Sequence, residues 1–261
     1  SSLRDRGFAI FSIGINIGAA TGPLIAGGVA AAYGWHAGFA LAAALMLLAL
    51  VIYLAGQRHL PDTRPPKKQR TAAPRLTVEE RRRVWILLAV VALTIPAEIA
   101  YPMVWSIGIV WVDQQVSLGT QFGTIPSSWF GSVDSIGSII AAPALIALWA
   151  SQARKGREPD SVTKIAIGTG LVAVAALVLA ASNMASAVPG SVSVGWALAG
   201  YLLMGLAWMY YWPTLLALIS RTAPPAVAST LMGGAFLSPF IGHTLMGWIG
   251  SHDTQPQVRL R

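Results

Sequence analysis

Three long stretches of the sequence, residues 7–57, 165–220 and 222–252, contain no Lys, Arg, Asp or Glu. Charged side chains make up about a quarter of an ordinary soluble domain, but only 11% of these 261 residues, of which 55% are hydrophobic. Stretches of this length without a charge cannot supply a water-exposed surface. The pattern excludes a soluble globular domain, a disordered chain and a collagen-like chain, and it predicts a membrane protein.

Seven apolar segments are each long enough to cross a bilayer, which takes about 20 residues in a helix. They are residues 7–32, 35–57, 83–112, 127–150, 162–184, 193–220 and 227–250. Strands of a membrane β-barrel are about ten residues long and alternate in polarity, whereas these runs are continuous and longer. The sequence therefore predicts an all-α, polytopic membrane protein with seven transmembrane helices.

The basic residues lie between the apolar segments. Sixteen of the 18 Lys and Arg fall at residues 4–6, 58–83, 154–164 and 221, and the other two lie in the C-terminal tail. If each segment crosses once, the sixteen share one side, which the positive-inside rule assigns to the cytoplasm. We therefore expect a multi-pass protein of the cell inner membrane, with the N-terminus and the 58–80 linker in the cytoplasm. The net charge of +8 then reflects topology, and the expected partner is the lipid bilayer, with no nucleic acid.

Local motifs predict how the helices begin, bend and pack. Thr77 and Glu80 have the spacing of a capping box at the start of the third helix. Pro96 and Pro102 lack a backbone donor, so we expect them to kink that helix and free carbonyl groups near its middle. Broken helices at membrane depth are tolerated where they line a cavity. In the first helix, the overlapping Gly-x-x-x-Gly repeats of residues 14–22 predict a face for close helix packing.

Two carboxyl groups lie at bilayer depth, where a charge costs a few kcal/mol and usually faces a partner or a wet cavity. Glu98 is midway along the third helix, and Asp134 is two turns into the fourth. We predict both as substrate-binding residues and as candidates for proton coupling. The alternative for each is a protonated or hydrogen-bonded packing residue. Asp113, at the outer end of the third helix, is expected to be solvated or to cap a helix.

Polar and aromatic residues mark two further helices. Asn16 lies among the glycines of the first helix, and its amide suits a substrate contact as well as a helix–helix hydrogen bond. The sixth helix carries the aromatic residues Trp208, Tyr210, Tyr211 and Trp212. They occupy nearly successive positions, which favours an interfacial or packing role over a stacking platform. His243 in the last helix is expected to be a packing residue.

Signatures of catalysis and of metal binding are missing from the sequence. It contains no His-Glu-x-x-His, Gly-x-Ser-x-Gly or phosphate-loop motif and no cysteine. These absences predict a protein that is not an enzyme and uses neither a metal nor a cofactor.

Four blocks in order along the chain resemble the proton-dependent oligopeptide transporters of the major facilitator superfamily. They are Arg6-Gly-Phe-Ala-Ile-Phe-Ser-Ile-Gly-Ile-Asn-Ile-Gly-Ala, Gly34-Trp-His-Ala-Gly-Phe-Ala-Leu-Ala-Ala, Ile125-Pro-Ser-Ser-Trp-Phe-Gly-Ser-Val-Asp and Gly156-Arg-Glu-Pro. The resemblance implies that the seven helices correspond to the fifth through eleventh of a twelve-helix transporter. The first four helices and the last would lie outside this chain.

The same resemblance implies a division of the chain into bundles. Residues 1–57 would be the last two helices of the N-terminal bundle and 58–80 the cytoplasmic linker. Residues 81–250 would be the first five helices of the C-terminal bundle, followed by a tail at 251–261.

The family's functional positions carry over unevenly. Asn16 matches the fifth-helix Asn that contacts peptide, and Asp134 falls where the eighth helix usually has Asn. The family's seventh-helix Glu-Gln pair aligns with Pro102 and Met103, and its tenth-helix Glu aligns with Trp208. Both family acids are therefore replaced, which makes Glu98 and Asp134 candidates for relocated acids and Trp208 a candidate substrate contact.

These observations predict a fragment of a proton-coupled secondary transporter that moves di- or tripeptides or related small solutes by alternating access. Protons and a small-molecule substrate are the expected partners. The alternative is a transport-inactive or sensory membrane protein that keeps the transporter framework without its coupling acids.

Overall fold

The computed structural model describes residues 2–59, 76–121, 123–185 and 188–253, and at residues 2–13, 15–16, 59 and 252–253 it describes the backbone only. The helices of this part of the chain are α1 (Ser2–Tyr33), α2 (Trp35–Gly56), η1 (Gln57–His59), α3 (Val78–Ala100), η2 (Tyr101–Trp105), α4 (Ile107–Gln115), η3 (Ser127–Trp129), α5 (Phe130–Arg154), α6 (Ser161–Met184), α7 (Val194–Thr222), α8 (Ala228–Ala235) and α9 (Leu237–Asp253). Each of the seven predicted segments is helical, which confirms the all-α prediction.

Five helices of the described residues are long and apolar enough to cross a membrane. They are the spans Trp35–Gly56, Val78–Trp105, Ser127–Arg154, Ser161–Met184 and Val194–Thr222. The other two predicted spans are α1, which has a shorter apolar stretch at Ile17–Tyr33, and the α8–α9 pair, which a break divides. The chain is thus a multi-pass membrane protein.

The third predicted span is broken where the sequence places Pro102. Helix α3 passes over Pro96 without interruption and gives way to a 3₁₀ turn, η2, before α4 begins at Ile107. Pro102 has no N–H for the carbonyl one turn earlier, and its ring crowds that carbonyl. The break frees polar backbone groups in the core of the bundle.

A second break, between α8 and α9, interrupts the last predicted span. The helix stops at Ala235 and resumes at Leu237, with Phe236 in the turn. Pro239 cannot donate to the carbonyl of Ala235 four residues before it, which gives the break a physical cause. The seventh predicted segment is therefore helical, as expected, but in two parts.

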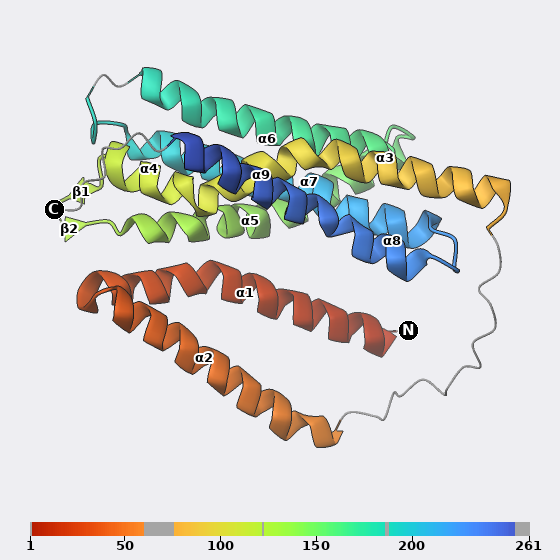
Figure 1. Ribbon diagram of the computed structural model, residues 1–261, viewed down its shortest axis with the longest axis horizontal. Coiled ribbons are helices and arrows are strands. Elements are labelled where there is room, and N and C mark those ends of the chain that lie inside the picture. Colours follow the sequence, from red (N-terminus) through yellow and green to blue (C-terminus); the bar gives the residue numbers. More distant parts are fainter. Residues whose placement is uncertain (1, 60–75, 122, 186–187, 254–261) are drawn as a thin grey trace.

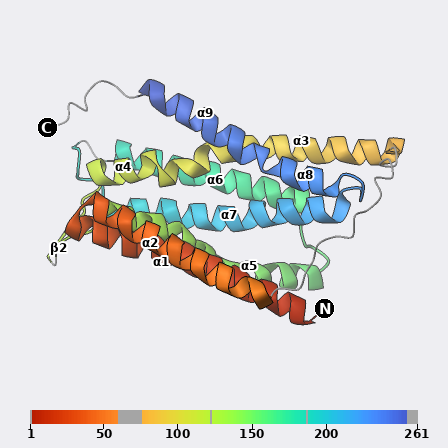
Figure 2. The same cartoon turned by 60° about the horizontal axis from the view of Figure 1, so that its bottom comes forward.

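The helices form an elongated bundle (Figure 1). Helix α7 packs along both α5 and α6, and α3 packs against α9. Helices α1 and α2 form an antiparallel pair that joins the rest through contacts of α1 with α5 and η3, as the turned view also shows (Figure 2). The largest side chains of the core come from α7, where Tyr201, Met204, Tyr211 and Leu215 are almost completely buried.

The described basic residues gather at one end of the bundle. The start of α3, the end of α5 and the start of α6 lie together at the right in Figure 1, and the hairpin of β1 (Gly119–Thr120) and β2 (Gly123–Thr124) lies at the opposite end. Arg81 to Arg83, Arg154 and Lys155 belong to the first group. At the hairpin end, Ser117 and Val192 join two loops through a backbone hydrogen bond of 2.9 Å. This arrangement agrees with basic segments that share one side of a membrane.

Two predicted packing features have different outcomes. The capping box is confirmed, because the Thr77 amide donates to the Glu80 carboxylate at 2.8 Å and the Glu80 amide donates to the Thr77 hydroxyl at 3.2 Å. The prediction of close helix packing at Gly14, Gly18 and Gly22 is wrong within the described part of the chain, because a Cβ at any of them would meet nothing within 4 Å.

Candidate functional site

Two acid–tyrosine pairs lie inside the bundle. Glu98 of α3 and Asp134 of α5 are each only 1% exposed. The Tyr101 hydroxyl donates to Asp134 Oδ2 at 2.7 Å, and the Tyr211 hydroxyl donates to Glu98 Oε1 at 3.0 Å. A carboxyl group in such a setting can hold a proton, and it can accept a hydrogen bond from a substrate amine. The structure thus gives both sequence-predicted acids a specific phenol partner.

The indole of Trp208 lies between the two tyrosines. It stacks on Tyr101 with ring centroids 4.7 Å apart and an interplanar angle of 20°, and it meets the edge of Tyr211 at 5.5 Å. Trp208 also stacks on Trp212, one turn along α7, at 5.3 Å. The predicted residues Glu98, Asp134 and Trp208 therefore belong to one cluster.

Close helix approaches hold the acids in place. A Cβ on Gly205 of α7 would overlap the carbonyl oxygen of Asp134, and a Cβ on Gly242 of α9 would overlap the carbonyl oxygen of Glu98. The Ser138 hydroxyl donates to the Gly205 carbonyl at 2.9 Å. Because two glycines let neighbouring helices touch the backbone at the acids, the depth of each carboxyl group is fixed by packing.

The broken helix carries Tyr101, the partner of Asp134. The hydroxyl of another tyrosine, Tyr201, stabilises the break itself. Tyr101 is the first residue of η2, but its backbone is still helical and its amide bonds to the Ala97 carbonyl, so it extends the path of α3 and reaches Asp134 of α5 from there. The Tyr201 hydroxyl donates to the Val104 carbonyl at 2.7 Å, and the Ser106 hydroxyl donates to the Pro102 carbonyl at 3.1 Å. These bonds satisfy carbonyl groups of the break, as irregular backbone within a membrane requires.

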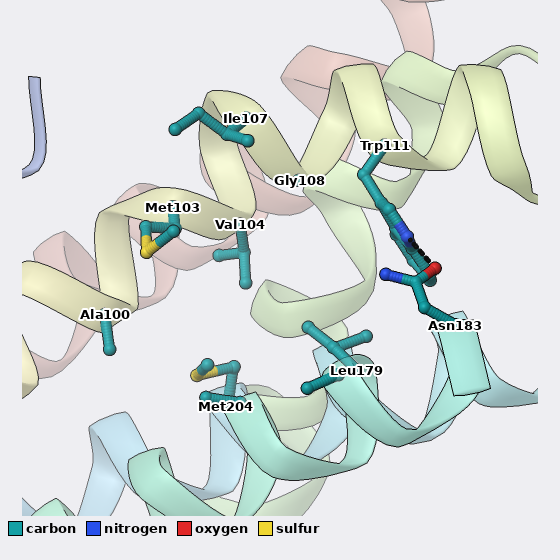
Figure 3. Close-up of a pocket in the computed structure, with 11 residues that line it drawn as sticks. Ala100, Met103, Val104, Ile107, Gly108, Trp111, Leu179, Asn183 and Met204 are labelled. Atoms are coloured by element: carbon teal, nitrogen blue, oxygen red, sulfur yellow. Dashed lines mark hydrogen bonds between the residues drawn. The ribbon is translucent and has the colours of Figure 1, made fainter. Parts of the chain in front are cut away.

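An apolar cavity of about 210 Å³ adjoins the break between η2, α4, α6 and α7 (Figure 3). Met103, Val104, Leu179 and Met204 are among its lining residues. Its polar feature is a hydrogen bond of 2.7 Å from the Trp111 indole to the Asn183 side chain, drawn as a dashed line in Figure 3. No ionisable side chain lines this cavity, so the acid–tyrosine cluster is the better candidate for chemistry.

The remaining sequence predictions have mixed outcomes. The side chain of Asn16 lies outside the described residues. Asp113 is exposed near the end of α4, in agreement with a solvated acid, and it lines a more polar cavity near Trp35 and Ser127. His243 is exposed on α9, and its assignment as a packing residue stays a prediction. Among the described side chains there is no group of three or more His, Cys, Asp or Glu that could hold a metal ion.

Sequence reasoning missed Tyr101 and assigned Tyr211 only to packing. One signal was available for each, because a buried carboxyl group needs a donor. Tyr101 follows Glu98 by three residues, yet its hydroxyl bonds to Asp134 of α5, which only the packing of α5 against this end of α3 brings within reach. Tyr211 is on another helix, and only the packing of α7 on α3 brings it to Glu98.

Comparison with known proteins agrees with this architecture. The family model of the Major Facilitator Superfamily matches residues 1–247. A peptide transporter of Yersinia enterocolitica, YePEPT, is 24% identical, and the match covers 98% of this chain and 63% of the relative. A di-/tripeptide transporter of Lactococcus lactis is 23% identical, with coverage of 91% and 60%. The chain therefore spans about 60% of the length of these curated relatives.

Solved structures give the same picture of the fold. A crystal structure of a mutant of the peptide transporter POT with sulfate has a TM-score of 0.85 and 22% identity, and covers 97% of this chain and 63% of the transporter. The complex of that mutant with alafosfalin has a TM-score of 0.83 and 23% identity, with coverage of 97% and 62%. Together with the family match, these likenesses confirm the resemblance predicted from the sequence: the chain belongs to the Major Facilitator Superfamily and is similar to its peptide transporters.

Proposed function

We propose that this chain is part of a proton-coupled secondary transporter that carries di- or tripeptides or related small solutes by alternating access. The observation that carries the proposal is the pair of buried acids, Glu98 and Asp134, each bonded to a tyrosine beside a broken helix. Intramembrane acids of this kind belong to substrate and proton pathways. The similar proteins of Yersinia and Lactococcus are a peptide transporter and a di-/tripeptide transporter, which supports the substrate class.

The proposed mechanism assigns one role to each part of the site. Glu98 and Asp134 take up protons, and the half-buried indole of Trp208 forms part of the wall that substrate meets. Protonation removes a negative charge that each phenol stabilises, which changes the relative stability of the two access states. The movement of protons down their electrochemical gradient then drives the solute against its own concentration gradient, and this mechanism uses no cofactor, metal or enzymatic step.

The bundle boundaries follow from the same proposal. Residues 1–57 form the last two helices of one bundle, 58–80 the cytoplasmic linker, and 81–250 five helices of the second bundle, with a tail at 251–261. Helix α1 of the first bundle contacts α5 and η3 of the second, which gives the two bundles a surface that can open and close.

Uptake in proteoliposomes tests the proposed function. The full-length protein, driven by an imposed pH gradient and offered a dipeptide panel, is expected to accumulate substrate. Glu98→Gln and Asp134→Asn are expected to lower gradient-driven uptake at least about tenfold, in the range for loss of a positioned proton carrier. Asp113→Asn, an exposed acid, serves as the matched control. Undiminished coupling in both buried-acid variants would remove these acids from the mechanism. Absence of any uptake would favour the transport-inactive or sensory alternative.

Single-cysteine labelling tests the proposed inner-membrane sidedness. This chain has no cysteine, so Arg70→Cys and Thr120→Cys each create a unique site in a full-length background from which any cysteine outside this chain is removed. In intact cells, a membrane-impermeant maleimide is expected to label position 120 and to spare position 70 until the membrane is opened. Labelling of position 70 from outside would reverse the proposed orientation.

A further inference from the structure

The two acid–tyrosine pairs come from different helices, and one further side chain, Trp208, contacts both of them. Asp134 and Tyr101 link α5 to η2, while Glu98 and Tyr211 link α3 to α7. Among the described residues, Trp208 is the one whose ring contacts both tyrosines. We propose that Trp208 is a positioning residue that couples the two pairs. A change in the hydrogen bonding or protonation of one carboxyl group then changes the proton affinity of the other.

The ring geometry supports the idea that a displacement of one tyrosine reaches the other through the Trp208 indole. Tyr101 and Trp208 lie face to face, so the phenol cannot tilt away from Asp134 without moving the indole. The edge of Tyr211 meets the same indole at 85°. Both Tyr211 and its acid Glu98 are buried to 1% exposure or less. In a close-packed interior, a displaced ring must displace its neighbours.

The stack also extends beyond the acids. Trp212 lies parallel to Trp208, and Phe236, in the turn between α8 and α9, meets Trp212 at 5.3 Å and 78°. A row of rings therefore runs from the phenol on Asp134 to the second helix break. This continuity connects Trp208 to the turn between α8 and α9. The inference rests on the proposed function, in which both acids take up protons.

Other titratable groups lie on the elements packed against these pairs. Tyr201 of α7 donates its hydroxyl to the Val104 carbonyl, and His243 of α9, next to the Gly242 that packs on Glu98, is exposed. Both remain unchanged in every variant below, so their contribution is constant across the comparison.

Infrared spectroscopy of the purified full-length protein in lipid measures the coupling without any transport assay. The C=O band of protonated Asp134 is assigned by its loss in Asp134→Asn, and its titration midpoint is followed with pH. Tyr211→Phe, which removes the donor to Glu98, is expected to move the Asp134 midpoint by about 0.5 to 1 pH unit. That shift equals about a threefold to tenfold change in the proton-binding constant.

The role of the indole is tested in two further backgrounds. In Trp208→Met the shift caused by Tyr211→Phe is expected to vanish, and in Trp208→Phe, which keeps a ring, most of it is expected to return. Trp149→Met, which removes a tryptophan that packs on Tyr210 elsewhere in the bundle, should leave the shift intact.

Two results would overturn the proposal. An equal shift with and without the Trp208 ring would mean that the acids interact directly through space. If Tyr211→Phe does not move the Asp134 midpoint in protein that retains Trp208, the two pairs are independent, and this result stands even if Trp208→Met does not fold. Neither result depends on whether the protein transports peptides, so failure of the coupling and failure of the proposed function are separate outcomes.

Discussion

At the scale of single residues, hydroxyl groups of tyrosine hold the polar core together. Tyr101 and Tyr211 each donate to a buried carboxyl group, and Tyr201 donates to a backbone carbonyl of the helix break. Each phenol places its ring among apolar neighbours and its hydroxyl on a buried acceptor. The same residue type thus supports the acids and the irregular backbone between them.

Removal of the Tyr201 hydroxyl tests its part in stabilising the break. Tyr201→Phe leaves the Val104 carbonyl buried without this donor, and we expect a loss of about 1–3 kcal/mol in the free energy of unfolding. The measurement is equilibrium unfolding of the full-length protein in mixed micelles. Tyr210→Phe, on the same helix with its ring against Trp149, is the control and should change stability little. Equal losses in both variants would argue against a specific role for the Tyr201 bond.

At the scale of helices, proline positions and small residues decide how the elements meet. Pro102 and Pro239 account for the two breaks, and Gly205 and Gly242 let α7 and α9 touch the backbone at the acids. These glycines were not singled out by the sequence pattern, whereas the more regular repeat of Gly14, Gly18 and Gly22 faces open space in the described chain. Spacing alone does not tell which glycine meets a neighbour.

A methyl group on Gly205 tests the approach of α7 to α5. Gly205→Ala would drive its Cβ into the carbonyl of Asp134, so we expect a loss of about 2–3 kcal/mol in unfolding free energy. Gly170→Ala in α6 is the matched control, because a Cβ there meets nothing within 4 Å. It should change stability by less than about 1 kcal/mol, in the stabilising direction. Similar behaviour of the two variants would show that α7 has room to move.

The start of α6 offers a prediction with a pH dependence. Asp160 caps this helix and accepts a hydrogen bond from the Thr163 amide at 3.1 Å, which holds the pKa of its carboxyl below the ordinary value. A lowered pKa means that the stabilisation is present above about pH 4 and is lost as pH falls through the folded value.

The expected signature is a difference between Asp160 variants. Asp160→Ala should be less stable than wild type at pH 7, and this difference should shrink as the pH is lowered below 4. Asp160→Asn keeps a capping side chain without titrating, so its difference from Asp160→Ala should not change with pH. Unfolding curves of the full-length protein between pH 3 and pH 7 provide the measurement. A gap between wild type and Asp160→Ala that stays constant with pH would contradict the assignment.

At the scale of the whole molecule, the contact of α1 with η3 and α5 is the meeting surface of the two proposed bundles. Gly27 lies close against η3 there, since a Cβ at this position would overlap the Ser128 hydroxyl and lie 2.9 Å from the Ser128 Cβ. A contact this close forms only when the bundles are together. The proposed alternating-access mechanism therefore predicts that Gly27 and Ser128 separate during transport.

Cross-linking tests this requirement. The double variant Gly27→Cys with Ser128→Cys has its Cβ atoms near disulfide distance. This chain has no other cysteine, and any cysteine outside it is removed from the full-length background. Oxidation is expected to abolish peptide uptake, and reduction to restore it. Gly22→Cys with Ser128→Cys is the control, because Gly22 faces open space in the described chain. Full uptake by the cross-linked protein would show that this contact stays closed throughout the cycle.

The sequence by itself determined the class of protein and the identity of its buried acids. Charge-free segments must leave water, basic residues sort between them, and a carboxyl group within an apolar helix is conspicuous because burial is costly. Glu98, Asp134 and the break at Pro102 could therefore be predicted from local pattern. Each of these features depends on one segment at a time.

The tertiary structure alone decided which groups meet. Tyr101 bonds to Asp134, 33 residues away, and Tyr211 bonds to Glu98, 113 residues away. Trp208 joins the two pairs only because α7 lies against both the broken helix and α5. Such pairings depend on helix crossing and on the rotation of each helix about its axis, which side-chain packing fixes and hydropathy does not encode.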